Sequence, residues 1–571
     1  MLYKRKLAGL AEGLECVAGK AIFIVPVCFF NFFAMFRLKS IVSEKTCKNI
    51  LVRGVNWIGD AVMTMPALRG IKLSHPDSKI TLLVKPWVSS LFEKDPNVDE
   101  IILYLDEYKG ILGKFRLANK IRKNNFCMAL LFQNAIDAAF ITFLSGIPER
   151  IGYSRDGRRI LLTKPVPFNN NAKRLHHVKY YLNLIDRAGF TTKESLPWIY
   201  MTLDERLNAR DKLKALKRPV IAVNPGAAFG SSKRWHPDRF AEVARRIIHE
   251  INGSVVILGG PSEIGIAEEI FNAFRIQKST VSPPTQPSPS RGEGKGGGET
   301  SQLLNFAGKT SLRELAALIS ECDALVTNDS GPMHIGYAVG TPVVAIFGST
   351  SPELTGPVGK GNIVIRKELD CSPCFERECR KRDLKCMDLI TYEEVFESVK
   401  KIISSKRAVF LDRDGTLCRD MNYLNKMEDL EIFPEVAYLA RIKEKGFKLI
   451  GISNQSGIAR GLVDENIVKQ VNNIFIDKYG FDGFYFCPHH PDEHCFCRKP
   501  EPGLLLKARI DHNIDLKGSF FIGDKESDMI LAKAVGAKGI LVKTGHEISS
   551  SYADFTVNDL KEAVDAILRL K

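Results

Sequence analysis

The sequence lacks the two glycine-rich signatures most often found in nucleotide-binding enzymes. It has neither the G-x-x-x-x-G-K-[ST] motif of P-loop proteins nor a G-x-G-x-x-G fingerprint between a predicted strand and a helix. It also lacks basic stretches interleaved with aromatic residues, which are typical of nucleic-acid-binding proteins. P-loop enzymes, dehydrogenases and nucleic-acid-binding proteins are therefore disfavoured. The net charge of +15 still indicates an anionic partner, such as a phosphorylated metabolite or an acidic membrane surface.

Long apolar runs are scarce as well. The run AIFIVPVCFFNFFAMF at 21–36 is shorter than the roughly 20 residues that a spanning helix needs, and it contains Pro26 and Asn31. Residues 1–48 carry 8 Lys and Arg against 3 Asp and Glu. We expect residues 1–48 to form a basic and apolar extension that tethers the chain peripherally to a membrane. A misassigned start codon and an extra packed helix are the alternatives. A signal peptide is disfavoured because it would export a chain that otherwise looks cytoplasmic.

The thirteen cysteines do not follow the pattern of a disulfide-rich secreted protein. Seven of them fall in two short clusters, at 371–386 and 487–497, with the spacing of metal ligands in a reducing compartment. We expect the other six to be buried thiols. The sequence therefore predicts a cytoplasmic protein, which lies at the cytoplasmic face of the inner membrane if residues 1–48 bind there.

Buried strands alternate with helices along most of the chain. NILVRGV (49–55) and KITLLVK (79–85) are typical buried strands, and AVMTMPALRGIKLS (61–74) has a helical pattern. Such alternation predicts parallel sheets with helices on both faces. The pattern restarts near 219 and again at 407, so we expect two doubly wound, Rossmann-like domains followed by a third α/β domain. The expected divisions of the chain are 1–48, 49–205, 206–403 and 404–571.

One segment interrupts this alternation. SPPTQPSPSRGEGKGGGE at 282–299 passes from Pro and Ser to Gly and charge, with no apolar residue to bury. We expect a disordered surface insertion within the 206–403 domain, between a helix and the strand that begins LLNFAGKTS. We assign it no function.

The motif FLDRDGTL places two aspartates at the end of a predicted strand. Asp412 follows the apolar run, and alternation along an extended backbone points Asp414 in the same direction. An aspartate in this position can attack phosphorus to form an acyl-phosphate, while the second donates a proton to the leaving oxygen. Because two close carboxylates need a cation, the pair predicts a Mg²⁺ site completed by further carboxylates.

Later motifs supply the rest of such a site. Ser453 ends the predicted strand FKLIGIS and can bind phosphoryl oxygens, and Lys499 in CRKP can neutralise them. Asp524 and Asp528 in FIGDKESD follow another strand and can complete the metal site. A single aspartate after a strand is commonly a helix cap. Here four elements follow one another along the chain: the pair Asp412 and Asp414, then Ser453, then Lys499, and finally the pair Asp524 and Asp528. This order resembles the haloacid dehalogenase superfamily of phosphatases.

The motif CPHHPDEHCFCRKP predicts a second metal site. Four soft or borderline ligands in C-x-H…C-x-C spacing suit a closed tetrahedral Zn²⁺ site: Cys487, His489, Cys495 and Cys497. His490 and His494 are competing ligands. A metal there would fix the loop that presents Arg498 and Lys499 to phosphate.

A zinc loop within this superfamily resembles the D-glycero-D-manno-heptose 1,7-bisphosphate phosphatases and the related histidinol-phosphatases. The resemblance implies that Asp412 is the nucleophile and Asp414 the general acid and base, and that both bind Mg²⁺ together with Asp524. It assigns the contacts to phosphate and substrate to four residues: Ser453, Asn454, Arg498 and Lys499. Only five residues separate His489 from Cys495, so the loop is compact.

Three earlier motifs place glycine-rich turns after predicted strands. WIGDAVMTMPAL (57–68) contains Asp60 ahead of a helix, which by itself would be interpreted as a helix cap. NPGAAFGSSKRW (224–235) contains Lys233. NDSGPMHIGYAVGTPVVAIFG (328–348) opens a helix whose free N–H groups suit a diphosphate.

Together these motifs resemble the ADP-heptose:lipopolysaccharide heptosyltransferases, most closely the type II enzymes, over residues 49–400. The resemblance implies a GT-B fold, in which a cleft separates two Rossmann-like domains. Asp60 would be the base that deprotonates the acceptor hydroxyl for inverting attack on the anomeric carbon, and Lys233 would stabilise the departing diphosphate. Contacts to the nucleotide sugar are assigned to Glu263 and to one turn: Asp329, Ser330, Gly331, Pro332, Met333 and His334. His334 could equally be a core residue.

The other cysteine cluster, CSPCFERECRKRDLKC, leaves two interpretations open. Its four thiols could hold zinc or an iron–sulfur cluster, or they could belong to a reduced structural loop: Cys371, Cys374, Cys379 and Cys386. The neighbouring Arg and Lys residues could face an anionic lipid acceptor.

The two resemblances concern the same sugar. They predict a bifunctional enzyme of lipopolysaccharide core heptose metabolism. One half would transfer heptose from ADP-heptose to the lipopolysaccharide inner core. The other would hydrolyse the C7 phosphate of heptose 1,7-bisphosphate through an aspartyl-phosphate. One alternative is a histidinol-phosphatase-like enzyme fused to a glycosyltransferase of other specificity. The other is a membrane-recruited scaffold whose transferase half is inactive.

Overall fold

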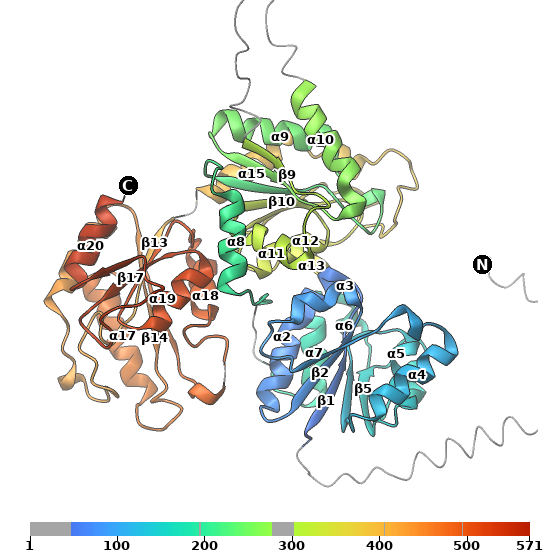
Figure 1. Ribbon diagram of the computed structural model, residues 1–571, viewed down its shortest axis with the longest axis horizontal. Helices are drawn as coiled ribbons and strands as arrows, with labels where there is room; N and C mark the ends of the chain where they lie inside the picture. Colours follow the sequence, from blue (N-terminus) through green and yellow to red (C-terminus); the bar gives the residue numbers. More distant parts are fainter. Residues whose placement is uncertain (1–46, 193–195, 277–301, 405, 494, 571) are drawn as a thin grey trace, which may run out of the picture.

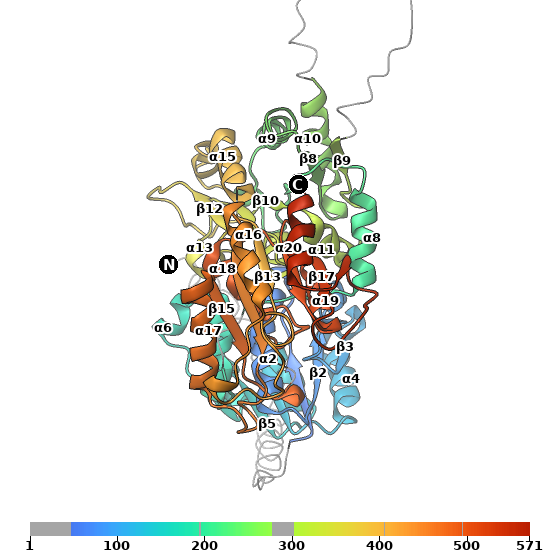
Figure 2. The same cartoon turned by 90° about the vertical axis from the view of Figure 1, so that its left-hand side faces the viewer.

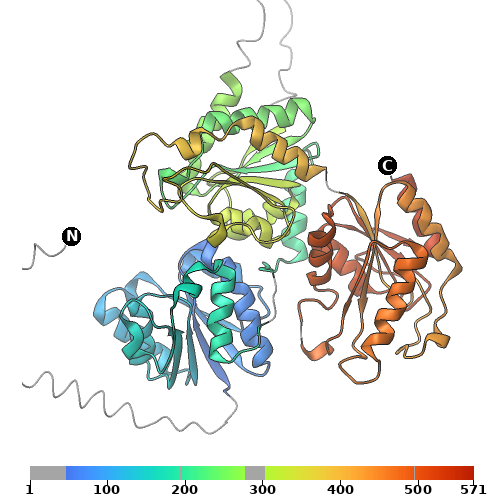
Figure 3. The same ribbon diagram turned by 180° about the vertical axis from the view of Figure 1, so that it is seen from behind.

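Three successive α/β units make up the protein, as shown by the computed structural model in Figure 1. The structure describes residues 47–192, 196–276, 302–404, 406–493 and 495–570. Each unit is built on a sheet of six parallel strands. The carboxyl-terminal unit lies to one side of the other two in Figure 1 and in Figure 3, which shows the chain from behind. In Figure 2 this unit faces the viewer.

The amino-terminal unit has the strand order β3-β2-β1-β4-β5-β6. Its strands are β1 (Asn49–Arg53), β2 (Lys79–Val84), β3 (Glu100–Leu103), β4 (Met128–Leu131), β5 (Glu149–Tyr153) and β6 (Lys164–Val166). On one face α2 (Ile58–Ser74) packs against α7 (His177–Ala188), and on the other α4 (Gly110–Arg122) packs against α5 (Ile136–Leu144). Because both faces are covered, β4 consists of apolar residues only, and β1 has an apolar run between Asn49 and Arg53.

The middle unit repeats this plan in the order β9-β8-β7-β10-β11-β12. Its strands are β7 (Val220–Asn224), β8 (Ser254–Ile257), β9 (Leu303–Asn305), β10 (Ala324–Asn328), β11 (Val343–Phe347) and β12 (Ile363–Arg366). One face carries α9 (Pro237–Glu250), α10 (Ile264–Ile276) and α15 (Tyr392–Ile403). The opposite face carries α8 (Leu203–Leu213), α11 (Leu312–Glu321) and α12 (Gly331–Ala338).

The carboxyl-terminal unit has the same order once more, β15-β14-β13-β16-β17-β18. Its strands are β13 (Ala408–Leu411), β14 (Lys448–Asn454), β15 (Gly483–Cys487), β16 (Phe520–Gly523), β17 (Lys538–Val542) and β18 (Phe555–Val557). Its main helices are α16 (Ala440–Glu444), α17 (Glu465–Tyr479), α18 (Gly503–His512), α19 (Glu526–Val535) and α20 (Leu560–Arg569). The predicted α/β architecture with three series of parallel strands is therefore confirmed.

The strand order decides where ligands can bind. In each sheet the chain moves outward from the first strand and then returns to the centre, so the connections after the two central strands leave the sheet in opposite directions. The crevice between them opens at the carboxyl ends of these strands. Asp412 follows β13 and Asp524 follows β16, so both stand at such a crevice.

The helix α8 bears on the boundary between the first two units. It begins at Leu203 behind a capping box made by Thr202 and Glu205, and it packs against α11 of the middle unit. We therefore propose that the division expected at 205/206 lies a few residues earlier, ahead of α8. At the carboxyl end of the middle unit, α15 packs on α9. The third unit begins after it, with β13.

The amino-terminal and middle units meet where α2 packs against α12. A Cβ on Gly59 would lie 2.6 Å from Cδ2 of His334, and a Cβ on Gly331 would lie 3.0 Å from Cβ of Ile58. The absence of side chains at these two glycines therefore allows the two helix starts to approach closely. His334 is 4% exposed, and its Nδ1 lies 2.9 Å from the hydroxyl of Tyr337.

Cysteine pairing is one expectation that the structure corrects. Cys47 and Cys127 were expected to be buried thiols, but the structure joins them in a disulfide. They precede adjacent parallel strands, and the amide of Cys127 donates to the carbonyl of Asn49, so their Cα atoms come within 5.8 Å. The 80-residue separation hides this proximity in the sequence. Cys322 and Cys418 are buried thiols, as expected.

Several expectations lie outside the described residues. These are the tethering segment within 1–48, the insertion at 282–299, the alternative ligand His494, and two of the six scattered cysteines, Cys16 and Cys28. Among the residues that the structure does describe, no helix combines the length and the apolar character needed to cross a membrane.

The buried His334 predicts an acid-sensitive contact between the first two units. Burial lowers the pKa of His334 to about 4, against the opposing effect of Asp329 and Asp60. An unfolded histidine takes up a proton below about pH 6.5 whereas the folded one resists until about pH 4, so acidification favours unfolding. Relative to His334→Gln, we expect the native chain to lose about 2 kcal/mol more free energy of unfolding between pH 7 and pH 5. Urea titrations at both pH values measure this, and equal losses in the two proteins would contradict the assignment.

Candidate functional site

The first candidate site lies where the amino-terminal and middle units face each other. Asp60 stands in the first turn of α2, and 27% of its side chain is exposed. Its Oδ1 lies 3.2 Å from Nδ1 of His177, at the start of α7. A partly exposed carboxylate held by an imidazole can accept a proton from a substrate hydroxyl. Sequence analysis missed His177, because nothing in the pair HH at 176–177 marks the ring that reaches Asp60.

The middle unit contributes a cation to the same region. Lys233 follows the glycine-rich turn after β7, and its Nζ lies 2.5 Å from Oδ2 of Asp329, which follows β10. Asp329 is 4% exposed and also accepts a 2.5 Å hydrogen bond from Thr350. The ring of Phe229 lies 4.6 Å beneath the Lys233 ammonium. An anionic ligand could replace Asp329 as the partner of the Lys233 ammonium.

The start of α12 lies in the same region of the middle unit. Ser330 is its N-cap residue, and Gly331 and Pro332 form its first positions. The Ser330 hydroxyl lies 3.1 Å from the Thr327 hydroxyl and 3.3 Å from Oδ1 of Asn224. The side chains of two further predicted residues, Met333 and His334, are buried beneath this turn. The exposed N–H groups of such a helix start can receive a diphosphate.

Glu263 lies beneath the neighbouring glycine turns. Its Oε2 accepts a 2.8 Å hydrogen bond from the amide of Gly260. A Cβ on Gly226 would lie 1.6 Å from Oε1 of Glu263, and one on Gly259 would lie 2.9 Å from Oε2. These turns follow β7 and β8, so the carboxylate is held between the ends of two adjacent strands. Only glycine permits that approach at Gly226.

The second candidate site lies in the crevice of the carboxyl-terminal sheet. Nζ of Lys499 lies 2.7 Å from Oδ1 of Asp412 and 2.7 Å from Oδ1 of Asp528, and it donates to the carbonyl of Ile452 at 3.2 Å. Burial would lower the pKa of Lys499, but the two carboxylates raise it. The buried lysine is therefore held as a cation between them.

Three buried carboxylates converge beside this lysine. Asp412, Asp524 and Asp528 offer oxygens within 4.8 Å of one another, a spacing that fits a divalent cation. Burial raises the pKa of Asp412 to about 6 and that of Asp524 to about 6. Among the described residues, Oδ1 of Asp524 has no hydrogen-bond partner, which leaves an acceptor oriented for a metal. A Cβ on Gly415, where φ is 85°, would lie 2.4 Å from Oδ2 of Asp524.

Asp414 is held apart from that cluster. Its Oδ1 accepts a 2.9 Å hydrogen bond from Nε of Arg413, and its Oδ2 accepts one of 2.7 Å from Nε2 of Gln455. Gln455 also donates to the hydroxyl of Ser453 at 2.7 Å. The side-chain amide of Gln455 thereby links Asp414 to Ser453, two residues that were predicted to act on the phosphoryl group. Sequence analysis missed Arg413 and Gln455, although each is adjacent to a predicted residue.

The other predicted contacts lie around the same crevice. The side chain of Asn454 accepts from the amide of Lys499 at 3.0 Å and donates to its carbonyl at 3.2 Å. It therefore orients the loop from which Lys499 projects. The amide of Arg498 donates to the carbonyl of Cys495, and among the described residues its Nη1 has no hydrogen-bond partner.

The predicted zinc ligands form a second cluster below that loop. The Sγ atom of Cys487 lies 3.3 Å from that of Cys495 and 3.4 Å from that of Cys497. Nδ1 of His489 lies 3.1 Å from Cys497 Sγ and 3.5 Å from Cys487 Sγ. Four donor atoms at these separations can surround a single tetrahedral ion. His490, the described alternative, instead has its Nδ1 3.3 Å from Asp492.

The other four clustered cysteines are more open. All four are free thiols, with Cys371 and Cys374 exposed and Cys379 and Cys386 half-buried. Burial and the three neighbouring thiols raise the pKa of Cys386, so the four lie in one region. Within the described residues they are not among the groups whose donor atoms lie within 4.8 Å of one another.

Comparison with protein families identifies both parts of the chain. The model of glycosyltransferase family 9 (heptosyltransferase) matches residues 114–287 and 295–385, and a HAD-hydrolase-like model matches residues 496–563. Lipooligosaccharide heptosyltransferase 2 of Haemophilus influenzae is 30% identical over 329 residues, covering 56% of this chain and 88% of that protein. D-glycero-beta-D-manno-heptose-1,7-bisphosphate 7-phosphatase of Helicobacter pylori is 40% identical over 173 residues, covering 29% of this chain and 99% of that protein.

Solved structures agree for the larger part. The family 9 glycosyl transferase from Veillonella parvula superposes with a TM-score of 0.53 at 24% identity, covering 63% of this chain and 99% of that one. ADP-heptose lps heptosyltransferase II of E. coli superposes with a TM-score of 0.51 at 24% identity, covering 62% and 98%. At this identity they support the fold, which is the predicted GT-B arrangement of two Rossmann-like units. The chain therefore belongs to the family 9 heptosyltransferases of type 2 and, in its carboxyl-terminal part, to the HAD-like heptose-bisphosphate phosphatases, as a fusion of the two.

Proposed function

We propose that this protein is a bifunctional enzyme of lipopolysaccharide heptose metabolism. Its transferase half, the amino-terminal and middle units, transfers heptose from ADP-heptose to the lipopolysaccharide inner core. Its phosphatase half, the carboxyl-terminal unit, removes the C7 phosphate of heptose 1,7-bisphosphate. The observation that carries the proposal is that each half has its own crevice equipped for one of these reactions. Asp60 is paired with His177 and Lys233 with Asp329 in the transferase half, and Asp412 is paired with Lys499 in the phosphatase half.

In the transferase half, Asp60 acts as the general base. It accepts the proton of the acceptor hydroxyl while that oxygen bonds to the anomeric carbon and the carbon–oxygen bond to the diphosphate breaks, with inversion. His177 positions the Asp60 carboxylate. Lys233 and the amides of the 329–334 turn stabilise the charge that develops on the departing diphosphate. Glu263 shapes the glycine turns on the nucleotide-sugar side.

In the phosphatase half, Asp412 acts as the nucleophile. Its carboxylate oxygen bonds to phosphorus as the bond between phosphorus and the C7 oxygen breaks, and Asp414 donates a proton to that leaving oxygen. Water then cleaves the acyl-phosphate, with Asp414 accepting its proton. Arg413 and Gln455 hold Asp414 in place, and Lys499, Ser453 and Arg498 bind the phosphoryl oxygens.

Mg²⁺ fits the acidic cluster of this half. Asp412, Asp524 and Asp528 would hold it, since hard oxygen donors at this spacing suit the ion and Asp524 retains an unpaired oxygen among the described residues. When bound, Mg²⁺ supplies positive charge that neutralises the phosphoryl group. Asp414 was also predicted as a metal ligand, but its carboxylate is engaged by Arg413 and Gln455.

Zn²⁺ fits the cysteine cluster as a structural ion. Cys487, His489, Cys495 and Cys497 would hold it, because three thiolates and one imidazole form a closed soft-ligand set. Cys497 is followed directly by Arg498 and Lys499. The ion would therefore fix the loop that presents these two cations to the substrate.

We propose a cytoplasmic location, with peripheral contact at the inner membrane through residues 1–48. Nine of the eleven described cysteines are free thiols, as is typical of a reducing compartment, and the Cys47–Cys127 disulfide is the exception. A nucleotide-activation step lies between the phosphatase product and the transferase donor. The fusion would therefore keep the enzymes of two steps of one route at a fixed ratio. It would not transfer the product directly between the two sites.

The phosphatase assignment predicts a substrate preference. Purified chain with Mg²⁺ should release phosphate from heptose 1,7-bisphosphate with a higher kcat/KM than from histidinol phosphate. Asp412→Asn should lower that release on the order of a thousandfold or more, because the nucleophile is lost. A preference for histidinol phosphate would instead favour the alternative of a histidinol-phosphatase-like enzyme, and the donor sugar of the transferase half would need a new assignment.

The transferase assignment predicts that Asp60→Asn lowers kcat about 10²- to 10⁴-fold for heptose transfer, the usual contribution of a general base. ADP release in the presence of an inner-core lipid acceptor measures this. Phosphate release by the same variant should be unchanged, since the two crevices are separate. If the native chain transfers no heptose while its phosphatase is active, the scaffold alternative gains support.

The cysteine cluster predicts one tightly bound zinc per chain. Elemental analysis of the purified protein should find this ion, and Cys497→Ser should lower its content and lower the Tm of the phosphatase half. Cys371→Ser is the matched control, because its exposed thiol lies outside the cluster. A native protein that retains no zinc after gel filtration at neutral pH would refute the assignment.

A further inference from the structure

The phosphatase half contacts the transferase half through an aromatic side chain inside its metal-binding loop. Phe496 stands between the ligands Cys495 and Cys497. Its ring centroid lies 6.0 Å from that of Trp198 and 6.3 Å from that of Tyr200. The guanidinium carbon of Arg69 lies 4.1 Å above the same ring. We call residues 495–497 the docking segment.

The partners of the docking segment belong to the part of the transferase that joins its two units. Residues 196–200 connect the amino-terminal unit to α8 of the middle unit, and Trp198 is buried in one apolar cluster with core residues of the phosphatase half. Arg69 lies on α2, whose first turn carries Asp60. The amide of Ile199 donates to the carbonyl of Ala338, at the end of α12 in the middle unit.

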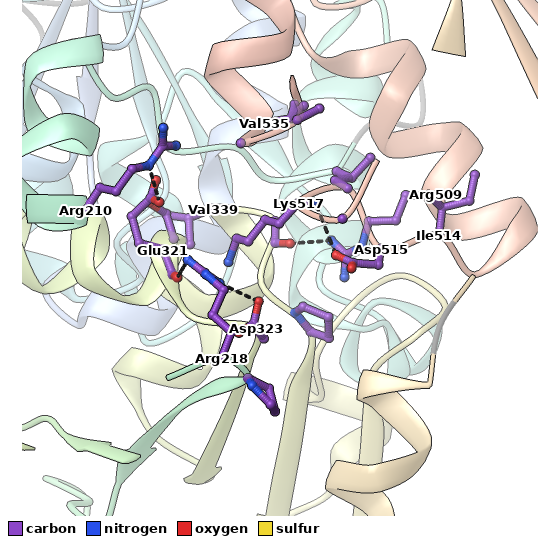
Figure 4. Close-up of a pocket in the computed structure, with 18 of the residues that line it drawn as sticks. Arg210, Arg218, Glu321, Asp323, Val339, Arg509, Ile514, Asp515, Lys517 and Val535 are labelled. Atoms are coloured by element: carbon purple, nitrogen blue, oxygen red, sulfur yellow. Dashed lines mark hydrogen bonds and ion pairs between the residues drawn. The ribbon is translucent and has the colours of Figure 1, made fainter. Parts of the chain in front are cut away.

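A separate contact ties the phosphatase half to the middle unit. Nη1 of Arg509, on α18, donates to the carbonyl of Gly340 at 2.8 Å, and Nζ of Lys517 donates to the carbonyl of Cys322. Figure 4 shows Arg509 and Lys517 at a cavity of about 650 Å³ between these units, with two ion pairs of the middle unit on the other wall. Those pairs are Arg210 with Glu321 and Arg218 with Asp323.

The phosphatase half therefore touches both transferase units and their connection. Two domains joined by a short connection rotate relative to each other by default, and closure of such a cleft is a common device for binding ligands. A third body in contact with both domains restricts that rotation. On the α2 side, the restriction depends on the docking segment.

We propose that the docking segment braces the two transferase units at a fixed angle, and that metal in the cysteine cluster of the phosphatase half thereby controls the transferase cleft. The metal-dependent part rests on the proposed zinc site. Cys495 and Cys497 flank Phe496, and their Sγ atoms lie 3.5 Å apart. An ion shared by these two sulfurs fixes the backbone between them, and with it the ring against Arg69, Trp198 and Tyr200.

Hydrogen exchange of the full-length chain tests the brace. In Phe496→Ala, we expect the amides of the 196–200 segment other than Pro197, including that of Ile199, to exchange about tenfold faster than in the native chain. We also expect the KM for ADP-heptose to rise more than kcat falls. Phe496→Leu, which keeps apolar volume without the aromatic face, should have an intermediate effect. Phosphate release by each variant reports whether its phosphatase half is folded.

Phe484→Ala is the matched control, because this half-buried ring contacts Phe475 and Phe481 within the phosphatase half. It should leave exchange of residues 196–200 unchanged. Equal exchange in the native chain and in a folded Phe496→Ala variant would overturn the brace.

Removal of zinc with a thiol-site chelator, in excess Mg²⁺, tests the metal dependence. Exchange of residues 196–200 should rise as in Phe496→Ala, and added Zn²⁺ should reverse the rise. If Phe496→Ala accelerates exchange but chelation does not, control by the metal is refuted and the brace stands. A chain that never contains zinc refutes the proposed zinc site, while the comparison of Phe496→Ala with Phe484→Ala still decides the brace.

Discussion

The return of the chain to the centre of each sheet is the constraint on which the sites of this protein depend. All three sheets place their first and fourth strands side by side, so the loops after these strands diverge and leave a crevice at the carboxyl edge. In the phosphatase half these strands are β13 and β16, and they bring Asp412 and Asp524 together across more than a hundred residues. The same order places the turns after β7 and β10 together, which pairs Lys233 with Asp329.

Burial strengthens the repulsion between like charges in these crevices. Asp412, Asp524 and Asp528 stand close together with little water, so burial raises their pKa values, and one lysine offsets part of the repulsion. Such a set of like charges has a large affinity for a divalent cation. In the transferase half the protein itself supplies a cation, Lys233, whose ammonium is paired with Asp329.

The fusion places two catalytic units in physical contact as well as in one chain. Phe496 lies between Cys495 and Cys497, and it is also the point at which their loop meets Arg69, Trp198 and Tyr200. The loop that carries Lys499 thus lies against the connection between the two transferase units. Contact of this kind would let one metal ion stabilise two active sites.

The sequence alone determined the three α/β units, because buried parallel strands form continuous apolar runs. It also predicted most of the named site residues, because acidic, basic and thiol side chains stand in the loops after those strands. Asp412, Lys233 and the C-x-H…C-x-C cluster could be found that way. His177, Arg413 and Gln455 could not, because they act through side-chain hydrogen bonds that no spacing encodes. The Cys47–Cys127 disulfide was missed since only strand pairing brings these residues together. The packing of Phe496 on Arg69 was likewise decided only by tertiary structure: contacts between units far apart in the chain leave no local periodicity in the sequence.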